Sequence, residues 1–193
     1  METTTFDSYQ LVTDTCIRAF CDESPIDPLE LATRIMSHPE FPMHYPSHHY
    51  LVPAVLLTTV LKDQNETLEN FKSDLETIHT RSLNVLGGFC GFYGACGAAV
   101  GLGIFMSVLT GTTPHTESTW AVTNRITGGA LIKMSEIDGP RCCKRNTFIA
   151  LKHAASFLKE EMKITIPLSE DIHCTFSESN SDCKHQACPF YKG

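Results

Sequence analysis

The sequence contains no Cys-x-x-Cys pair, although nine of its 193 residues are cysteine. Zinc ribbons and thioredoxin-like redox sites are built on that pair, so its absence counts against both classes. The chain also lacks a basic excess, with 15 lysines and arginines against 22 acidic residues and a net charge of −7. We therefore expect no nucleic-acid partner, because nucleic-acid-binding domains carry basic surfaces.

A secretory signal is also missing from the first residues. The segment METTTFDSYQ has neither a basic stretch nor an apolar one, so we expect a cytoplasmic protein. Stable disulfides are uncommon in that compartment, and an odd number of cysteines cannot all pair internally. The clustered cysteines are therefore expected to bind metal or to carry out redox chemistry.

The patterns along the chain predict an all-α fold, a single-domain helical bundle with a central Gly-rich buried helix and an irregular Cys-containing C-terminal tail. Asp27 and Pro28 mark one helix start, and Asn65 is expected to cap another. We expect an N-terminal helical extension over residues 1–40 and a Cys-rich helical metal-binding domain over residues 41–193. The expected helices cover 9–20, 29–36, 51–61, 66–86, a segment ending at 109, 118–137 with a break at 128–129, and 141–162. Residues 39–50 are expected to be loop, and 163–167 a short extended piece.

The Gly-rich stretch GGFCGFYGACGAAVGLGIF, residues 87–105, carries no charge. A membrane span and a buried core helix are both compatible with that composition. The apolar part is short, however, and basic or tryptophan anchors are missing on both sides, so we expect no membrane association. We predict a core helix on which Gly94, Ala98 and Gly101 form a small-residue face for close packing.

Two cysteines, Cys90 and Cys96, lie within this stretch. Six residues of helix would turn them about 240° apart, so both cannot share one helix face. We predict that Cys90 lies in the glycine turn and Cys96 in the first two turns of the helix. The helix N-terminus would then stabilise the thiolates.

The motif GPRCCKRN places two adjacent cysteines, Cys142 and Cys143, at the start of a predicted helix. Three basic residues surround them, which favours the thiolate form and would help to hold an anionic cluster. A phosphate or carboxylate site, or a plain surface charge cluster, is the simpler alternative. The predicted cofactor-binding residues are Arg141, Lys144 and Arg145.

The tail CTFSESNSDCKHQACPFYKG contributes Cys174, Cys183 and Cys188. A Cys-Pro pair ends the run, as in ferredoxin-type ligation, but the spacings match neither ferredoxin pattern. The tail is too polar to form its own core, and metal ligation would hold it in place. A mobile tail with free thiols is the alternative.

Histidines cluster in HYPSHHYLVP, before a predicted buried helix. His48 and His49 are predicted as further metal ligands, and the role of His44 is left open. The alternative is a polar loop whose histidines only bridge neighbouring helices.

With HHYLVPAVLL, GFCGFYGACGAAVG, GPRCCKRN and CPFY together, the chain resembles an uncharacterised cysteine-rich domain family of anaerobic archaea and bacteria, found alone or attached to radical-SAM or methyltransferase-like modules. The resemblance covers about residues 40–193. It implies anaerobic, cytoplasmic metal or sulfur chemistry, and it brings no catalytic residue with it.

The leading hypothesis is an iron–sulfur protein that acts in electron transfer, sulfur handling or metallocofactor maturation, with a redox or maturation enzyme as its protein partner. The cofactor would be a [4Fe–4S] or larger cluster, held by ligands from the set Cys90, Cys96, Cys142, Cys143, Cys174, Cys183 and Cys188. One rival is a thiol redox or sulfur-transfer enzyme that uses Cys142 or Cys143. The other is a structural zinc module that binds a partner.

Overall fold

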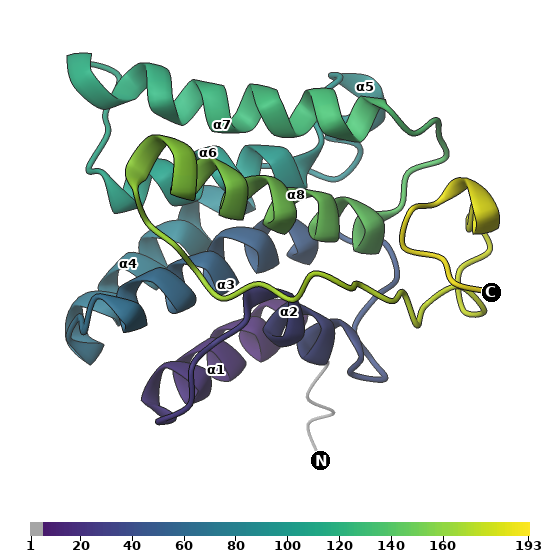
Figure 1. Cartoon of the computed structure of the whole chain (residues 1–193), viewed down its shortest axis with the longest axis horizontal. Helices are drawn as coiled ribbons and strands as arrows, with labels where there is room; N and C mark the ends of the chain where they lie inside the picture. Colours follow the sequence, from purple (N-terminus) through teal and green to yellow (C-terminus); the bar gives the residue numbers. More distant parts are fainter. Residues whose placement is uncertain (1–5) are drawn as a thin grey trace.

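The computed structural model describes residues 6–193 as one all-α domain, which confirms the predicted fold class. Figure 1 shows the helices packed against one another, with α3 near the middle of the bundle. The elements are α1 (Ser8–Cys21), α2 (Pro28–Met36), α3 (Ser47–Asp63), α4 (Leu68–Leu83), α5 (Phe89–Phe92), α6 (Gly97–Leu109), α7 (Glu117–Ser135) and α8 (Cys143–Phe157), followed by a π-helical turn (Leu158–Met162) and a 3-10 turn (His185–Ala187).

Helix α3 is the centre of the core. Its residues from Tyr50 to Leu57 are almost completely buried, as the continuous apolar run predicts. The helix begins at Ser47, so the prediction of loop up to residue 50 is wrong at its end. Pro46 stands at the helix start with φ −58°, an angle that suits helix entry. The helix therefore includes the two consecutive histidines, and Pro53 falls in its second turn.

Helix α6 packs directly on α3 through glycine. A Cβ added at Gly97 would lie 2.2 Å from the His49 ring, and one at Gly101 would lie 2.7 Å from the His49 carbonyl oxygen. Pro53 has no N–H to donate to that carbonyl, so α6 covers an oxygen left free inside α3. The small-residue face is therefore real but uses Gly97, because Gly94 precedes the helix with φ +67°. Among residues 6–193, no helix is long and apolar enough to cross a membrane.

Two helices, α4 and α7, differ from the sequence prediction. Thr67 caps α4 by accepting from the Asn70 N–H, whereas Asn65 takes a left-handed φ of 55° in the turn before it. Helix α7 runs unbroken through its two central glycines. At Gly129 the His153 ring of α8 comes so close that a Cβ would lie 2.7 Å from it, so this glycine serves helix packing.

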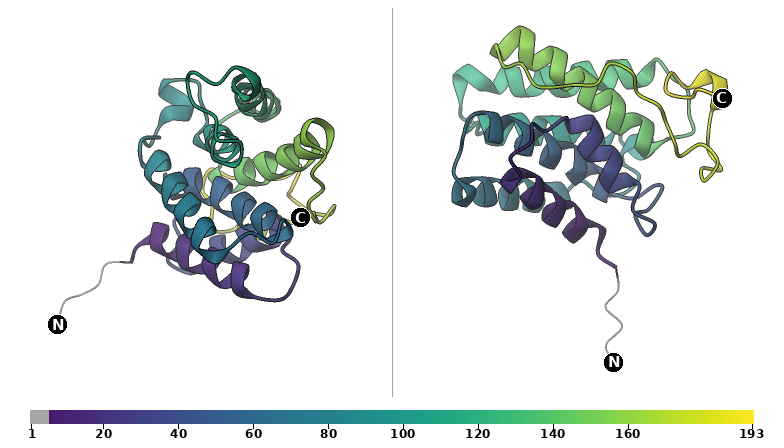
Figure 2. Two further views of the ribbon diagram at one scale, coloured as in Figure 1. Left: turned by 90° about the vertical axis from the view of Figure 1, so that its left-hand side faces the viewer. Right: turned by 60° about the horizontal axis from the view of Figure 1, so that its bottom comes forward.

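The N-terminal helices are part of the same core as the rest of the chain. Val12 and Cys16 of α1 are fully buried, and Ile35 of α2 is 1% exposed. The chain after α8 runs back along the bundle, as Figure 1 and the right-hand view of Figure 2 show, and residues 163–168 have no regular secondary structure.

The first turns of α3, α6 and α8 meet at one end of the bundle. The α3–α6 contact joins His49 to Gly97, and the Asn146 amide of α8 donates to the Cys96 sulfur at 3.2 Å. The tail returns to this same end. Three helix N-termini, each with a partial positive charge, therefore face the region that holds the cysteine motifs.

Candidate metal–thiolate site

Four cysteine thiols line one small cavity at this end of the bundle. Cys142 is the N-cap of α8, and the other three thiols, Cys174, Cys183 and Cys188, come from the tail. Four polar residues also line the cavity, namely Arg145, Ser177, Asn180 and Lys184. The fold thus brings together one thiol of the GPRCCKRN motif and all three thiols of the tail. We call these four residues the tail-thiol group.

Aromatic anchors position the tail. Phe190 is 6% exposed and packs edge-on against Phe148 of α8, with ring centroids 5.3 Å apart. The Cys174 N–H donates to the Phe190 carbonyl at 2.8 Å, which ties the two ends of the tail together. Phe176 is also buried. The tail therefore has an apolar anchorage that the sequence prediction, which assigned its placement to metal alone, did not include.

N–H groups point at the sulfur atoms of the tail-thiol group. The Arg145 N–H and the Asn180 side-chain amide donate to the Cys142 sulfur at 3.4 and 3.5 Å. The His185 N–H donates to the Cys183 sulfur at 3.4 Å. A thiolate accepts such bonds far better than a thiol does, and N–H donors around the sulfurs are a feature of metal-bound thiolates. Three N–H groups thus point at two of the four sulfur atoms.

Lys144 is a buried cation beside these sulfurs. It is 1% exposed, donates to the Met36 carbonyl at 3.1 Å, and lies between the rings of Phe41 and Phe176 at 4.7 and 4.8 Å. Burial lowers the pKa of Lys144 to about 8, and the nearby Cys143, Cys142 and Cys174 thiols partly offset this effect by raising that pKa. Within the described residues it makes no ion pair with a carboxylate.

Arg145 is a second buried cation, 4% exposed, with neutral partners in the Pro140 carbonyl and the Asn146 side chain. It too has no carboxylate partner among residues 6–193. Arg141 is exposed instead. The three predicted basic residues thus differ: two are buried next to the thiols, and one lies at the surface.

Burial has a larger effect than the basic surroundings on the pKa of the two thiols in the α8 motif. It raises the pKa of Cys143 to about 12, with the nearby Cys96 and Cys142 thiols adding to the effect, and it raises the pKa of Cys142 as well. The expectation that the helix terminus and the basic residues keep a free thiolate here is therefore wrong, because loss of solvent outweighs both. A compensating positive ion is what would hold these sulfurs ionised.

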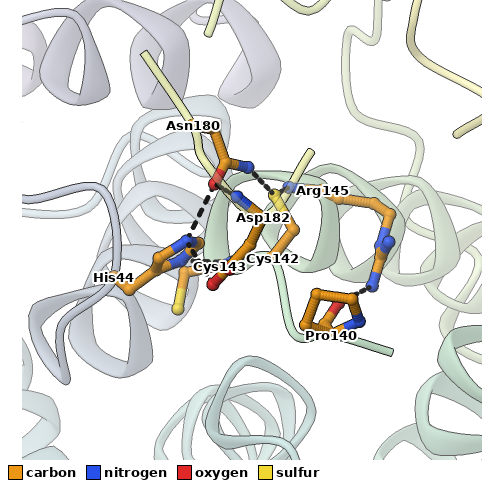
Figure 3. Close-up of polar contacts among 7 residues, drawn as sticks. All are labelled: His44, Pro140, Cys142, Cys143, Arg145, Asn180 and Asp182. Atoms are coloured by element: carbon orange, nitrogen blue, oxygen red, sulfur yellow. Dashed lines mark hydrogen bonds and ion pairs between the residues drawn. The ribbon is translucent and has the colours of Figure 1, made fainter. Parts of the chain in front are cut away.

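Cys143 lies outside the tail-thiol group, because it does not line the shared cavity. Figure 3 shows the sulfur of Cys142 directed toward Asn180, while that of Cys143 points another way. The Cys96 and Cys142 thiols add to the burial that raises the pKa of Cys143, and the Cys90 thiol adds to the burial that raises the pKa of Cys96. Cys90 is in α5 and Cys96 is the N-cap of α6, each slightly off its predicted place.

His44 is the histidine that joins the site. Its Nε2 lies 3.1 Å from the Asn180 side-chain oxygen and 3.7 Å from an Asp182 carboxylate oxygen, and the Cys143 N–H donates to its Nδ1. Through Asn180 it supports the Cys142 sulfur, as Figure 3 shows. Burial lowers the pKa of His44.

The two predicted histidine ligands make other contacts. His48 is 1% exposed, bonds the Tyr45 carbonyl at 2.9 Å, and has a pKa lowered to about 3 by burial. Its Nε2 is buried with no hydrogen-bond partner. His49 bonds the Val85 carbonyl at 2.8 Å and packs on Gly97, and burial lowers its pKa as well. The contacts of both rings are with backbone and packing partners.

Asn180 is the residue that sequence reasoning missed. It is 7% exposed in a polar tail and touches both His44 and Cys142. Its only sequence signal is its place between Cys174 and Cys183. Within residues 6–193, no three His, Cys, Asp or Glu side chains are placed to hold a single metal ion together.

Comparison with known proteins gives one match. A family model described as a family of unknown function, DUF5714, matches residues 16–191. It begins earlier than residue 40, where the sequence resemblance was expected to start, and so includes the C-terminal part of α1 and all of α2. No curated protein and no solved structure matches the chain.

Proposed function

Since this chain belongs to DUF5714, a family of unknown function, we propose a function from the site alone: it is an iron–sulfur protein. The tail-thiol group, Cys142, Cys174, Cys183 and Cys188, supplies four thiolates to one four-iron cluster. Four cysteine thiolates are the usual ligand set of such a cluster. The proposal keeps four of the seven predicted cysteine ligands in this cluster.

The single observation that carries the proposal is the pairing of four convergent thiols with two buried cations that lack carboxylate partners. Burying an unpaired cation is costly, so a compensating anion nearby is expected. A cluster held by four thiolates carries net negative charge. Lys144 and Arg145 would balance that charge from within the protein.

A single zinc ion is the alternative occupant of the tail-thiol group. The four line one cavity, yet no three described side chains are placed to share one ion. Zinc draws its ligands in with bonds of about 2.3 Å, while a four-iron cluster sets its thiolates farther apart because they bind different irons. The thiol-enzyme alternative receives no support from the raised pKa of Cys142 and Cys143.

The proposed role is electron transfer to or from a protein partner, a redox or cofactor-maturation enzyme of anaerobic cytoplasmic metabolism. Cys183 and Cys188 are partly exposed, which would put the cluster close to the surface. A cluster near the surface can exchange electrons with a docked protein.

The test is anaerobic purification of the wild-type protein and of C174S, with iron, sulfide and zinc measured per chain. We expect a brown wild-type protein that contains iron and sulfide, and a clear loss of both in C174S. The matched control is C21S, because Cys21 is exposed on α1 and distant in the chain from the site motifs. Zinc without iron would support the structural zinc module instead. A metal-free protein with rapid alkylation of Cys142 or Cys143 would support the thiol enzyme.

A further inference from the structure

An open groove of about 470 Å³ runs between α6 and α7, which lie side by side in the upper part of Figure 1. The two helices come so close within it that a Cβ added at Gly103 of α6 would lie 2.4 Å from the Thr127 hydroxyl of α7. Val100, Ile104 and Leu131 line the groove with partly buried apolar side chains. Its volume is within the range of about 300–1,000 Å³ that is typical of small-molecule sites.

The polar side chains of α7 that line the groove make hydrogen bonds within their own helix. The Thr123 hydroxyl donates to the Thr119 carbonyl at 3.0 Å, and the Thr127 hydroxyl donates to the Thr123 carbonyl at 3.3 Å. The Asn124 side-chain amide donates to the Trp120 carbonyl at 2.8 Å. Because these donors are used by backbone carbonyls, this side of the groove suits the apolar part of a ligand better than a polar part.

Arg81, in the last turn of α4, is the charged residue of the groove lining. Its guanidinium donates to the Ser107 hydroxyl at 2.8 Å, and that hydroxyl donates in turn to the Thr112 carbonyl at 3.0 Å. Among residues 6–193, Arg81 makes no ion pair with a carboxylate. A guanidinium carries five N–H donors in a planar fork that matches a carboxylate, so the Ser107 end of the groove is suited to one.

Gly128 leaves the groove wider than the fold requires. It lies inside α7 without a positive φ, and a Cβ added there would meet no atom within 4 Å. Glycine inside a helix is destabilising relative to alanine, yet neither backbone conformation nor packing within the chain calls for it at this position. Since Gly128 lines the groove, the missing side chain adds to the space that a ligand can occupy.

We propose that the α6–α7 groove binds an aliphatic carboxylate, with the alkyl chain along Val100 and Ile104 and the carboxylate on Arg81. The lining of α6 extends from Val100 to Ser107, which is about 10 Å at the rise of an α-helix and suits an alkyl chain of medium length. The positive charge at one end selects an anionic head group over a neutral or cationic one. This goes beyond the proposed function and does not depend on it, because the groove and the tail-thiol cavity share no lining residue.

The first experiment titrates the ¹⁵N-labelled wild-type chain with octanoate, 1-octanol and acetate and follows the backbone amide signals by nuclear magnetic resonance. Octanoate should produce saturable shifts at Gly103 and Gly128, and octanol should bind at the same place about fivefold more weakly, because it lacks the ion pair. Acetate, which has the head group without the chain, should give no saturable shift over the same concentrations. Octanol binding as tightly as octanoate, acetate binding equally well, or no saturable shift in the groove would overturn the proposal.

The second experiment repeats the octanoate titration with variants of the groove. R81Q should weaken octanoate binding about fivefold and leave octanol binding unchanged, whereas the matched control K72Q, which removes an exposed charge of the same helix outside the groove, should bind both as wild type does. G128L should lose octanoate binding without a lower melting temperature, because its side chain enters open space and leucine favours the helix. Wild-type affinity for octanoate in R81Q, or in a folded G128L, would overturn the site.

Discussion

Replacing Lys144 with methionine tests whether this cation balances the charge of a cluster. Methionine keeps a similar length between Phe41 and Phe176 but removes the ammonium group and its bond to the Met36 carbonyl. Lys152 on the exposed side of the same helix is the matched control, because K152M removes one charge without touching the site.

The effect on the metal-free protein should be small. Burial lowers the pKa of Lys144 from 10.5 to about 8, so keeping it charged at neutral pH costs about 3 kcal/mol. K144M removes that cost but also removes a hydrogen bond and two cation–aromatic contacts, each worth about 1 kcal/mol. The two changes nearly cancel, so the free energy of unfolding should move by about 1 kcal/mol or less.

The effect on the cluster should be much larger. Two unit charges about 7 Å apart interact by roughly 2 kcal/mol at an effective dielectric constant of about 20. Reduction adds one negative charge, which Lys144 stabilises, so K144M should lower the midpoint potential by about 85 mV. K152M should leave it almost unchanged. Anaerobic redox titration measures both, and equal potentials in K144M and wild type would refute the charge-balancing role.

Two further predictions concern the fold around the site. G101A should lower the free energy of unfolding by about 1–3 kcal/mol, because its Cβ would overlap the α3 backbone. The control G128A on α7, where a Cβ meets open space, should be neutral or stabilising by up to about 1 kcal/mol. Thermal melting compares the two variants, and equal melting temperatures would contradict the close α3–α6 packing. Because burial lowers the pKa of His48 to about 3 from 6.5, the unfolded chain binds a proton there first, and stability is lost as pH falls from 6.5 toward 3 at about 1.4 kcal/mol per unit. H48N should therefore remove about 1.4 kcal/mol of the stability difference between pH 7.5 and 5.5 in urea denaturation, and an identical difference in both proteins would contradict a neutral buried imidazole.

Local signals in the sequence were enough for most of the helices. Asp27 and Pro28 predict the start of α2, since a side-chain cap and a first-turn proline act within a few residues. The start of α3 was missed because three prolines and three histidines read as loop, while the core needs the helix to begin at Ser47. The continuity of α7 was missed because Gly129 is required by close packing against the His153 ring of α8, a contact that the local sequence does not reveal.

The site was only partly accessible from the sequence. The motif at Cys142 and Cys143 could be identified from the sequence, because the two cysteines and the basic residues beside them are neighbours in the chain. The meeting of the tail thiols with Cys142 depends on where the tail returns, and Phe176 and Phe190 anchor that path by packing into the core. His44 and Asn180 lie far apart in the chain and meet only after folding, so no spacing rule connects them.

The position of the tail after all eight α-helices sets an order of events during synthesis. Residues 8–157 form the bundle and supply Cys142, but the other three thiols of the tail-thiol group are translated later. Domains begin to fold from the N-terminal side as they emerge from the ribosome, so the scaffold exists before its ligand set is complete. Under the proposed function, cluster insertion is therefore a late step, and a chain that ends after α8 carries one of the four proposed ligands.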